Sequence, residues 1–223
     1  MSRKLSILIL VLIVLVILSS CSLDQGANSM DSTREYEQLS DRLQAQIDRS
    51  QDDYLSAESD KTLDELIRLN SIIYGSFTST GASEILAIFK VKNTPHAFGF
   101  DRTIAVIYDT DTYKLKSQKT FVADNVFIQL LENADQRHNI LYIGIVSNQG
   151  YTTYDIELLQ VEANEWLSKE ISHEKFADTD AFSFSDHVLQ VFELSYSNYN
   201  PVYNHKYSLY WDGLETIFKK ELP

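Results

Sequence analysis

Hydrophobic side chains recur at every second position through most of the chain beyond about residue 72. One face of an extended segment carries Tyr203, His205, Tyr207, Leu209 and Trp211, while polar residues such as Asn, Lys and Ser lie between them. Short turn sequences rich in Asn, Asp and Gly separate such runs. This pattern predicts strands joined by tight turns, and therefore a mainly β domain over residues 72–223.

Three runs within this domain resemble one another: ILAIFKVKN from Ile85, ILYIGIVSN from Ile140 and VLQVFELSY from Val188. Their starts are 55 and 48 residues apart. The strand that follows each run also aligns and places three residues in equivalent positions: Ile104, Ile156 and Leu209. The approach to the next unit recurs too, because FVADNVF (121–127) resembles FADTDAF (176–182).

These similarities predict three degenerate units of about 50 residues, each an antiparallel meander of three or four strands. The spacing is typical of β-propeller blades, although a closed propeller has about four blades or more. The alternatives are a propeller-like set of units that associates with a second copy of the chain, a β-sandwich, and an open stack of meanders. A chance resemblance between alternating strands is a further alternative.

Two helices are expected before the β domain. Tyr36, Leu39, Leu43 and Ile47 form a narrow hydrophobic stripe at helical spacing within residues 31–50. A second helix is expected over residues 62–70, where Thr62 and Glu65 have the spacing of a capping box. Residues 33–71 therefore form either an oligomerising stalk or helices that dock on the β domain, and the stripe is short for a coiled coil.

The composition disfavours anionic partners and rules out an internal disulfide. The formal net charge of -13 opposes binding to nucleic acid and to anionic lipid head groups. The chain has a single cysteine, so the fold does not depend on an internal disulfide. The 13 Tyr and 11 Phe favour strands.

The first twenty residues have the layout of a secretory signal peptide. Arg3 and Lys4 precede an uninterrupted hydrophobic stretch from Ile7 to Leu18, and two small residues follow, Ser19 and Ser20. The stretch is shorter than the approximately 20 residues that a membrane-spanning helix needs. Residues 1–20 are therefore expected to be removed; a retained membrane anchor is the alternative.

The segment Leu18-Ser19-Ser20-Cys21 resembles the lipobox of bacterial lipoproteins. This resemblance implies that the Cys21 thiol carries a diacylglycerol, with acyl chains such as palmitate, and that Cys21 becomes the first residue after cleavage. Two acyl chains anchor a protein stably where one does not. Residues 21–32 then form a lipidated tether, and the protein is expected at the cell membrane, facing the extracytoplasmic side. Either a Gram-positive or a Gram-negative envelope fits.

The sequence contains no short motif of a common enzyme class, metal site or nucleotide site. Its five histidines, His96, His138, His173, His187 and His205, have no metal-ligand spacing. We therefore expect no catalytic residue, no metal and no cofactor. The leading hypothesis is a non-enzymatic binding or interaction module. The alternative is an envelope hydrolase that uses carboxylates as acid and base, which no motif identifies.

The candidate ligand surface is the tyrosine-rich segment from Tyr196 to Trp211. Its rings belong to Tyr196, Tyr199, Tyr203, Tyr207 and Trp211. Aromatic rings beside Asn and His suit a glycan or a protein partner, since they offer apolar area with a polar rim. Packing of the same rings against neighbouring strands is the alternative. The expected partners are thus the membrane, through Cys21, and a protein or an envelope glycan; a homo-oligomer also fits the incomplete set of units.

Overall fold

The computed structural model describes residues 36–95, 97, 99–198 and 200–220. The chain divides into two compact units, residues 1–42 and residues 43–223. Within the first unit the described residues, 36–42, are helical, and this helix ends at residue 44. The predicted signal peptide, Cys21 and the tether lie outside the described residues.

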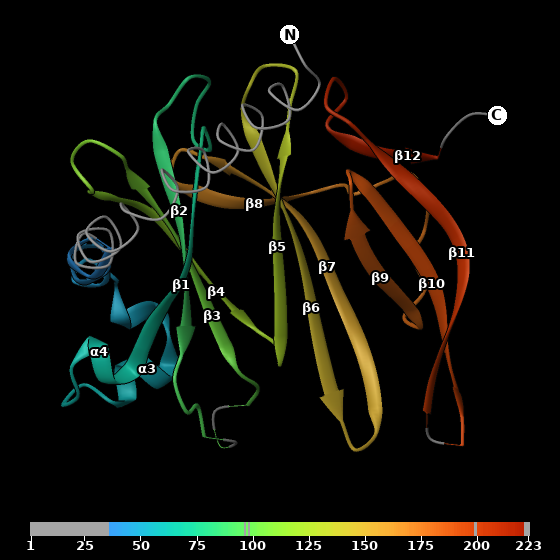
Figure 1. Ribbon diagram of the computed structural model, residues 1–223, viewed down its shortest axis with the longest axis horizontal. Coiled ribbons are helices and arrows are strands. Elements are labelled where there is room, and N and C mark those ends of the chain that lie inside the picture. The colour runs from blue at the N-terminus through green and yellow to red at the C-terminus, as the bar shows by residue number, and fades with distance from the viewer. Residues whose placement is uncertain (1–35, 96, 98, 199, 221–223) are drawn as a thin grey trace, which may run out of the picture. The chain divides into compact units, whose positions relative to one another are not determined.

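The second unit is mainly β. Its described residues form twelve strands in three antiparallel four-stranded sheets, and the strands of each sheet are consecutive in the chain (Figure 1). Sheet A contains β1 (Ile67–Gly75), β2 (Glu84–Val91), β3 (Arg102–Asp109) and β4 (Leu115–Val122). Sheet B contains β5 (Asn125–Glu132), β6 (His138–Asn148), β7 (Tyr151–Glu162) and β8 (Glu165–Lys169). Sheet C contains β9 (Asp180–Ser185), β10 (Val188–Ser197), β11 (Asn200–Asp212) and β12 (Ile217–Lys220).

This arrangement confirms the prediction of a mainly β fold built from repeated meanders. The three aligned runs are the second strands of the three sheets, β2, β6 and β10, and the strands that follow them are the third and fourth of each sheet. Each sheet has one further strand at its start. The units are therefore four-stranded, and the sheets do not close on one another within the described residues.

Sheet B lies between the other two sheets. One core cluster joins residues of sheets A and B, including Leu86 and Ile140, and a second joins sheets B and C, including Leu141 and Leu189. The sequence alignment of Leu86, Leu141 and Leu189 as equivalent residues is therefore wrong in register. Leu86 and Leu141 face the next sheet, whereas Leu189 faces the preceding one. A shift of one residue reverses the face of every side chain in a strand. The hydrophobic runs of β2 and β6 are buried on both faces, so hydrophobicity alone did not indicate which of their faces corresponds to the buried face of β10.

The free face of sheet A is covered by the segment that precedes it. This segment contains a short 3-10 helix, η1 (Arg49–Gln51), and two α-helices, α3 (Asp53–Ala57) and α4 (Leu63–Leu66). The Tyr108 hydroxyl donates to the Leu43 carbonyl oxygen over 2.7 Å, and Asp48 and Gln118 exchange two hydrogen bonds of 3.0 Å. The hydrophobic residues of the segment are buried: Leu43, Ile47, Tyr54, Leu55 and Leu66. Residues 43–66 therefore dock on the β domain.

The helices are shorter than the sequence pattern indicated. The capping contact of α4 is present, since the Thr62 amide donates to the Glu65 carboxylate over 2.8 Å, but the helix ends at Leu66 and β1 begins at Ile67. Pairing of Ile67 with Val91 in β2 draws these residues into sheet A. Long-range pairing thus overrides the local helical spacing. Among the residues that the structure describes, no helix combines the length and hydrophobicity needed to span a membrane.

Candidate functional site

Two long hairpins of neighbouring sheets meet at their tips. The β6–β7 hairpin and the β10–β11 hairpin extend side by side (Figure 1), and the rings of Tyr151 and Tyr196 pack edge to face with centroids 5.2 Å apart. The Thr152 amide donates to the Tyr196 hydroxyl, which in turn donates to the Thr152 carbonyl oxygen over 3.2 Å. The Tyr196 side chain therefore occupies the hydrogen-bonding position that a neighbouring strand would take.

The β6–β7 hairpin closes with a tight two-residue turn. Gln149 and Gly150 both have positive φ, 49° and 85°, and the flanking residues Asn148 and Tyr151 pair across the turn. Positive φ at both central residues is the type I′ geometry, whose twist matches that of the strands it joins. The turn therefore holds Tyr151 at the first position of β7, where the residue is 63% exposed.

The segments that form the two tips contain no charged residue of their own, although the Asp124 carboxylate accepts a 2.7 Å hydrogen bond from the Ser147 amide. Residues 147–154 and 195–205 contain neither Asp, Glu, Lys nor Arg, although these four types make up 23% of the chain. They are instead rich in Tyr, Asn, Ser and Thr. We call their described residues the hairpin-tip surface. Tyrosine gives contact area at low entropic cost, and Asn and Ser adapt their hydrogen bonds, so this composition suits contact with an uncharged surface.

The predicted tyrosine-rich surface is divided in the structure. Tyr196 and Tyr203 belong to the hairpin-tip surface, while Tyr199 lies outside the described residues. Tyr207 and Trp211 are partly buried against the core between sheets B and C. The Trp211 indole N–H donates to the Glu132 carbonyl oxygen over 2.8 Å, which joins β11 to the end of β5.

A β-bulge in β11 causes this division. Val191 pairs with Tyr207, but the next residue, Phe192, pairs with His205, so that Lys206 is an extra residue in β11. An extra residue reverses the alternation of side chains beyond it. Tyr203 and His205 consequently contact the Phe192 ring, and the prediction that Tyr203 shares one face with Tyr207, Leu209 and Trp211 is wrong.

Sequence reasoning missed the tyrosines of the neighbouring hairpin. The hydroxyl groups of Tyr154 and Tyr203 are 3.3 Å apart, and the Tyr154 ring contacts the Phe182 ring at a centroid distance of 6.4 Å. Burial, followed by the hydrogen bond to Tyr203, raises the pKa of Tyr154, so its phenol is neutral near pH 7. The Asn-Gln-Gly turn next to Tyr-Thr-Thr-Tyr indicated a hairpin with tyrosines near its tip. It did not indicate that the β10–β11 hairpin lies beside this one.

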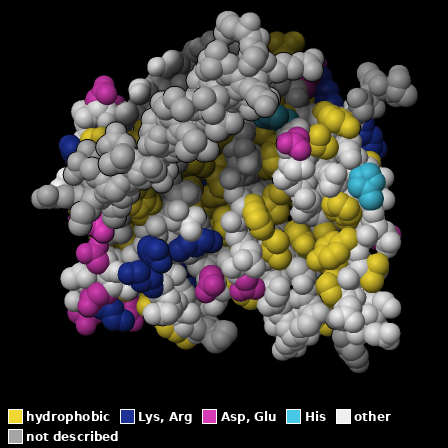
Figure 2. Space-filling model, viewed as in Figure 1, with side chains coloured by type: hydrophobic (Ala, Val, Ile, Leu, Met, Phe, Trp, Pro, Cys, Tyr) yellow, Lys and Arg dark blue, Asp and Glu magenta, His cyan; other side chains and the backbone are white. Residues whose placement is uncertain are grey.

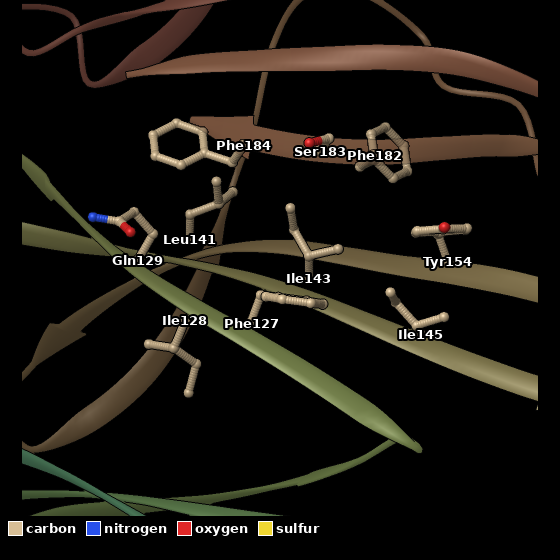
Figure 3. A pocket seen from close by; sticks show the side chains of 10 residues that line it. All are labelled: Phe127, Ile128, Gln129, Leu141, Ile143, Ile145, Tyr154, Phe182, Ser183 and Phe184. Atoms are coloured by element: carbon tan, nitrogen blue, oxygen red, sulfur yellow. The ribbon is translucent and has the colours of Figure 1, made fainter. Parts of the chain in front are cut away.

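Tyr154 also lines an apolar groove between sheets B and C. The groove has a volume of about 360 Å³ and is lined by residues of β5, β6, β7 and β9: Phe127, Ile128, Gln129, Leu141, Ile143, Ile145, Tyr154, Phe182, Ser183 and Phe184 (Figure 3). None of these side chains is charged. Hydrophobic side chains are also gathered over the middle of the face shown in Figure 2, where these strands lie.

Two edge strands border this groove. β5 is an edge strand of sheet B and β9 is an edge strand of sheet C, and each contributes three consecutive residues to the lining. Successive side chains of a strand point to opposite faces, so a groove lined by three consecutive residues reaches the strand backbone. Figure 3 shows this for Ile128, whose side chain points away from the groove between its neighbours Phe127 and Gln129. Phe127 is 59% exposed.

A pair of carboxylates lies on β7. Asp155 and Glu157 are two residues apart and so point to the same face, and Glu157 forms a 3.1 Å ion pair with Lys119. Burial, followed by the charge of Glu157, raises the pKa of Asp155. Neither residue lines the groove. Among the described residues, no group of three His, Cys, Asp or Glu side chains is placed to hold a metal ion.

Comparisons of the chain with protein-family models, with curated proteins and with solved structures found no match in any of the three.

Proposed function

We propose that this protein is a lipid-anchored extracytoplasmic binding protein without catalytic activity. The lipobox-like segment that ends at Cys21 supports the anchor and the location. The hairpin-tip surface and the adjoining groove are the proposed contact region, because together they place exposed aromatic rings and an apolar depression on neighbouring elements.

The observation that carries the proposal is the lack of charge at the tips of two adjacent hairpins in an acidic chain. Solubility alone would favour charged residues at such projecting turns. Exposed Tyr151 and Tyr203, 63% and 46% accessible, instead belong to sequence segments rich in Asn, Ser and Thr. Contact with an uncharged part of a partner accounts for this composition.

A protein partner is the first candidate. The groove that includes Tyr154 is lined mostly by hydrophobic residues and is bordered by two edge strands, and both features suit a polypeptide. A neutral envelope glycan is the second candidate, since the exposed tyrosine rings of the hairpin-tip surface provide flat apolar area beside hydrogen-bonding amides and hydroxyls.

We also infer that the three units are related as propeller-like blades. Each sheet packs face to face on the next through a hydrophobic cluster, and each starts with an edge strand: β1, β5 and β9. A scattering profile of the purified protein tests this relation. A β-sandwich of two facing sheets, or separate sheets, would give a different profile.

Photocrosslinking in the producing cells tests the binding function. A photoreactive phenylalanine analogue replaces Tyr151, and in a matched variant it replaces Tyr74, which is 64% exposed on β1 and lies outside the hairpin-tip surface. We expect a discrete adduct from position 151 only. Digestion of the adduct with protease or with glycosidase then identifies its class. Equal labelling from both positions would contradict a binding role for the hairpin-tip surface.

The anchor is tested separately. The substitution Cys21→Ala removes the acceptor thiol, so we expect the protein to move from the membrane fraction to the soluble extracytoplasmic fraction and to lose incorporation of labelled palmitate. Unchanged membrane association of the Cys21→Ala protein would overturn the lipoprotein assignment.

A further inference from the structure

We propose that the groove between β5 and β9 accepts an extended, apolar segment of a protein partner, which adds to sheet B as a further strand beside β5. This inference rests on the proposed binding function and names the chemistry of the partner. The segment carries hydrophobic residues at alternate positions and basic residues at its ends.

The backbone of β5 offers the hydrogen bonds for an added strand. β5 pairs with β6 on one side, and among the described residues no strand pairs with its other side. The groove reaches this backbone at Ile128, whose own side chain points away from it (Figure 3). An exposed strand edge presents a row of amide and carbonyl groups that pairs readily with an extended chain.

The side chains of the groove fit alternate residues of such a segment. Phe127 from β5, Ile143 from β6 and Phe182 from β9 line it from both sheets. Side chains that share a face of a strand are about 7 Å apart, so consecutive inward-facing residues of the segment would enter the groove side by side. Phe127 is the exposed ring that the segment would cover.

The carboxylates around the groove favour basic residues at the ends of the segment. The groove itself is uncharged, but Asp124 precedes β5, Glu132 ends it, and Asp186 follows β9. Among the described residues, none of these three carboxylates forms an ion pair, although that of Asp124 accepts a 2.7 Å hydrogen bond from the Ser147 amide. Together with the net charge of -13, they favour a segment with Lys or Arg at its ends and disfavour a second copy of this acidic chain.

The lining disfavours other occupants. Gln129, Tyr154 and Ser183 are the polar residues among the ten that line the groove, so its side chains offer a sugar few hydrogen-bonding partners, whereas the evenly spaced backbone groups of β5 match those of an extended chain. A lipid chain would fill the apolar space but would not use the open edge of β5. A basic-ended strand uses the apolar lining, the backbone edge and the acidic surroundings together.

Peptide titration tests the proposal. The probe is a fluorescent peptide of about nine residues with alternating Val and Thr and two Lys at each end, added to the full chain purified from membranes in detergent. We expect saturable binding by fluorescence anisotropy. N-methylation of alternate backbone nitrogens, which removes donors without changing the side chains, should weaken binding at least about tenfold. Replacement of the lysines by Glu should weaken it similarly at low salt.

Two protein variants locate the site. Phe127→Ala should weaken peptide binding about tenfold, since an aromatic ring at the centre of an interface carries much of the affinity. Tyr74→Ala, which removes an exposed ring from β1, should leave the affinity unchanged. Circular dichroism checks that both variants are folded; the exposure of both rings makes folding defects small.

Each contrary result has a distinct meaning. No binding of the lysine peptide, or equal binding of its N-methylated form, would overturn strand addition. The proposal would also be overturned if the chain self-associated and Phe127→Ala abolished this self-association, because a second copy would then occupy the groove. Crosslinking from position 151 with no peptide binding would leave the proposed function standing and refute this inference alone. Absence of both the crosslink from position 151 and peptide binding would refute the proposed function as well.

Discussion

The hydroxyl oxygens of Tyr154 and Tyr203 lie 3.3 Å apart and connect sheet B to sheet C at the hairpin tips. The two residues are 49 positions apart in the chain, and the contact is a direct hydrogen bond between side chains. A second link, from Tyr196 to Thr152, lies beside it. The hairpin-tip surface therefore depends on hydrogen bonds between sheets as well as within them.

The substitution Tyr196→Phe should loosen the two tips without unfolding the protein. It removes the hydroxyl that accepts from the Thr152 amide and donates to its carbonyl oxygen, while the ring contact with Tyr151 remains. We expect a loss of about 1 kcal/mol in the free energy of unfolding. Faster hydrogen exchange at Thr152 checks the local effect. Unchanged exchange at Thr152 would show that the hydroxyl does not hold the tips together.

The substitution Gly144→Ala should destabilise the protein by about 2 kcal/mol or more through overpacking. A Cβ atom at this position would lie 2.1 Å from the Tyr142 hydroxyl oxygen, and the Tyr142 ring is itself stacked on Phe121 at a centroid distance of 4.3 Å. Urea unfolding measures the loss.

The double variant Tyr142→Phe with Gly144→Ala provides the control for this clash. Removing the hydroxyl should recover part of the stability and leave a smaller conflict with the ring, whose nearest carbon lies 2.7 Å from the position that the added methyl group would occupy. Strictly additive losses for the two substitutions would show that the hydroxyl is not the obstacle.

The substitution Glu84→Gln should cost about 2–4 kcal/mol at pH 7. The Glu84 side chain is fully buried; it accepts from the Phe77 amide over 2.7 Å and from the Thr78 amide over 2.9 Å, and it pairs with Lys116 at 2.7 Å. Burial opposes ionisation of this carboxyl, but the hydrogen bonds from Lys116, Thr78 and Phe77 outweigh burial and lower its pKa below the ordinary value of 4.5.

The pH dependence of this effect follows from the direction of the shift. A pKa that is lower in the folded state than in the unfolded state stabilises the protein above the unfolded value, and the contribution is lost as pH falls through the folded value. The difference in stability between the wild-type protein and Glu84→Gln should therefore be constant from pH 7 to about pH 5 and decrease below pH 4.5. A difference that grows on acidification would contradict the assignment.

The substitution Arg102→Met should release the helical segment from sheet A. The Arg102 guanidinium lies 3.2 Å from the Asp52 carboxylate and 2.6 Å from that of Asp53, and the Arg102 and Asp52 side chains are both almost completely buried. Leaving Asp52 buried without its partner should cost about 3 kcal/mol. Hydrogen exchange over residues 43–66 should accelerate more than exchange in sheets B and C.

Combining Asp52→Asn with Arg102→Met distinguishes the effect of the Asp52 charge from its role as a helix cap. Asp52 accepts from the Tyr54 and Leu55 amides at the start of α3, and asparagine fulfils that capping role without the charge. The double variant should therefore be more stable than Arg102→Met alone. Equal stability of the two would show that the buried charge of Asp52 is not the cause.

Local sequence patterns predicted the strands better than their faces. Alternation identified β11 and the three-fold recurrence of β2, β6 and β10, because strand formation follows from local hydrophobic spacing. The bulge at Lys206 and the reversed face of Leu189 were missed, since both depend on which residue lies opposite in a neighbouring strand. The sequence predicts a helix over residues 67–70 because Ile67 and Leu69 fit both spacings, and only their pairing with β2 decides between them.

The candidate site was foreseen only in part. Tyr196 and Tyr203 belong to an unusual local concentration of rings, which composition alone reveals. Their neighbours Tyr151 and Tyr154 come from a hairpin about 45–50 residues earlier, and their approach follows from the packing of sheet B on sheet C. The groove is likewise a product of that packing. Phe127 and Phe182 were aligned as the ends of two similar segments, yet nothing local indicated that they would line the same depression.

The contact between Leu43 and Tyr108 determines where mechanical load enters the β domain. Tension along the chain from the amino-terminal side would act on the hydrogen bond between the Tyr108 hydroxyl and the Leu43 carbonyl, and on the paired Asp48 and Gln118. Both contacts belong to sheet A, whereas the hairpin tips belong to sheets B and C. A pulling force applied on the amino-terminal side would thus separate residues 43–66 from sheet A before it strained the hairpin tips of sheets B and C, so that this segment would protect the tips from mechanical load.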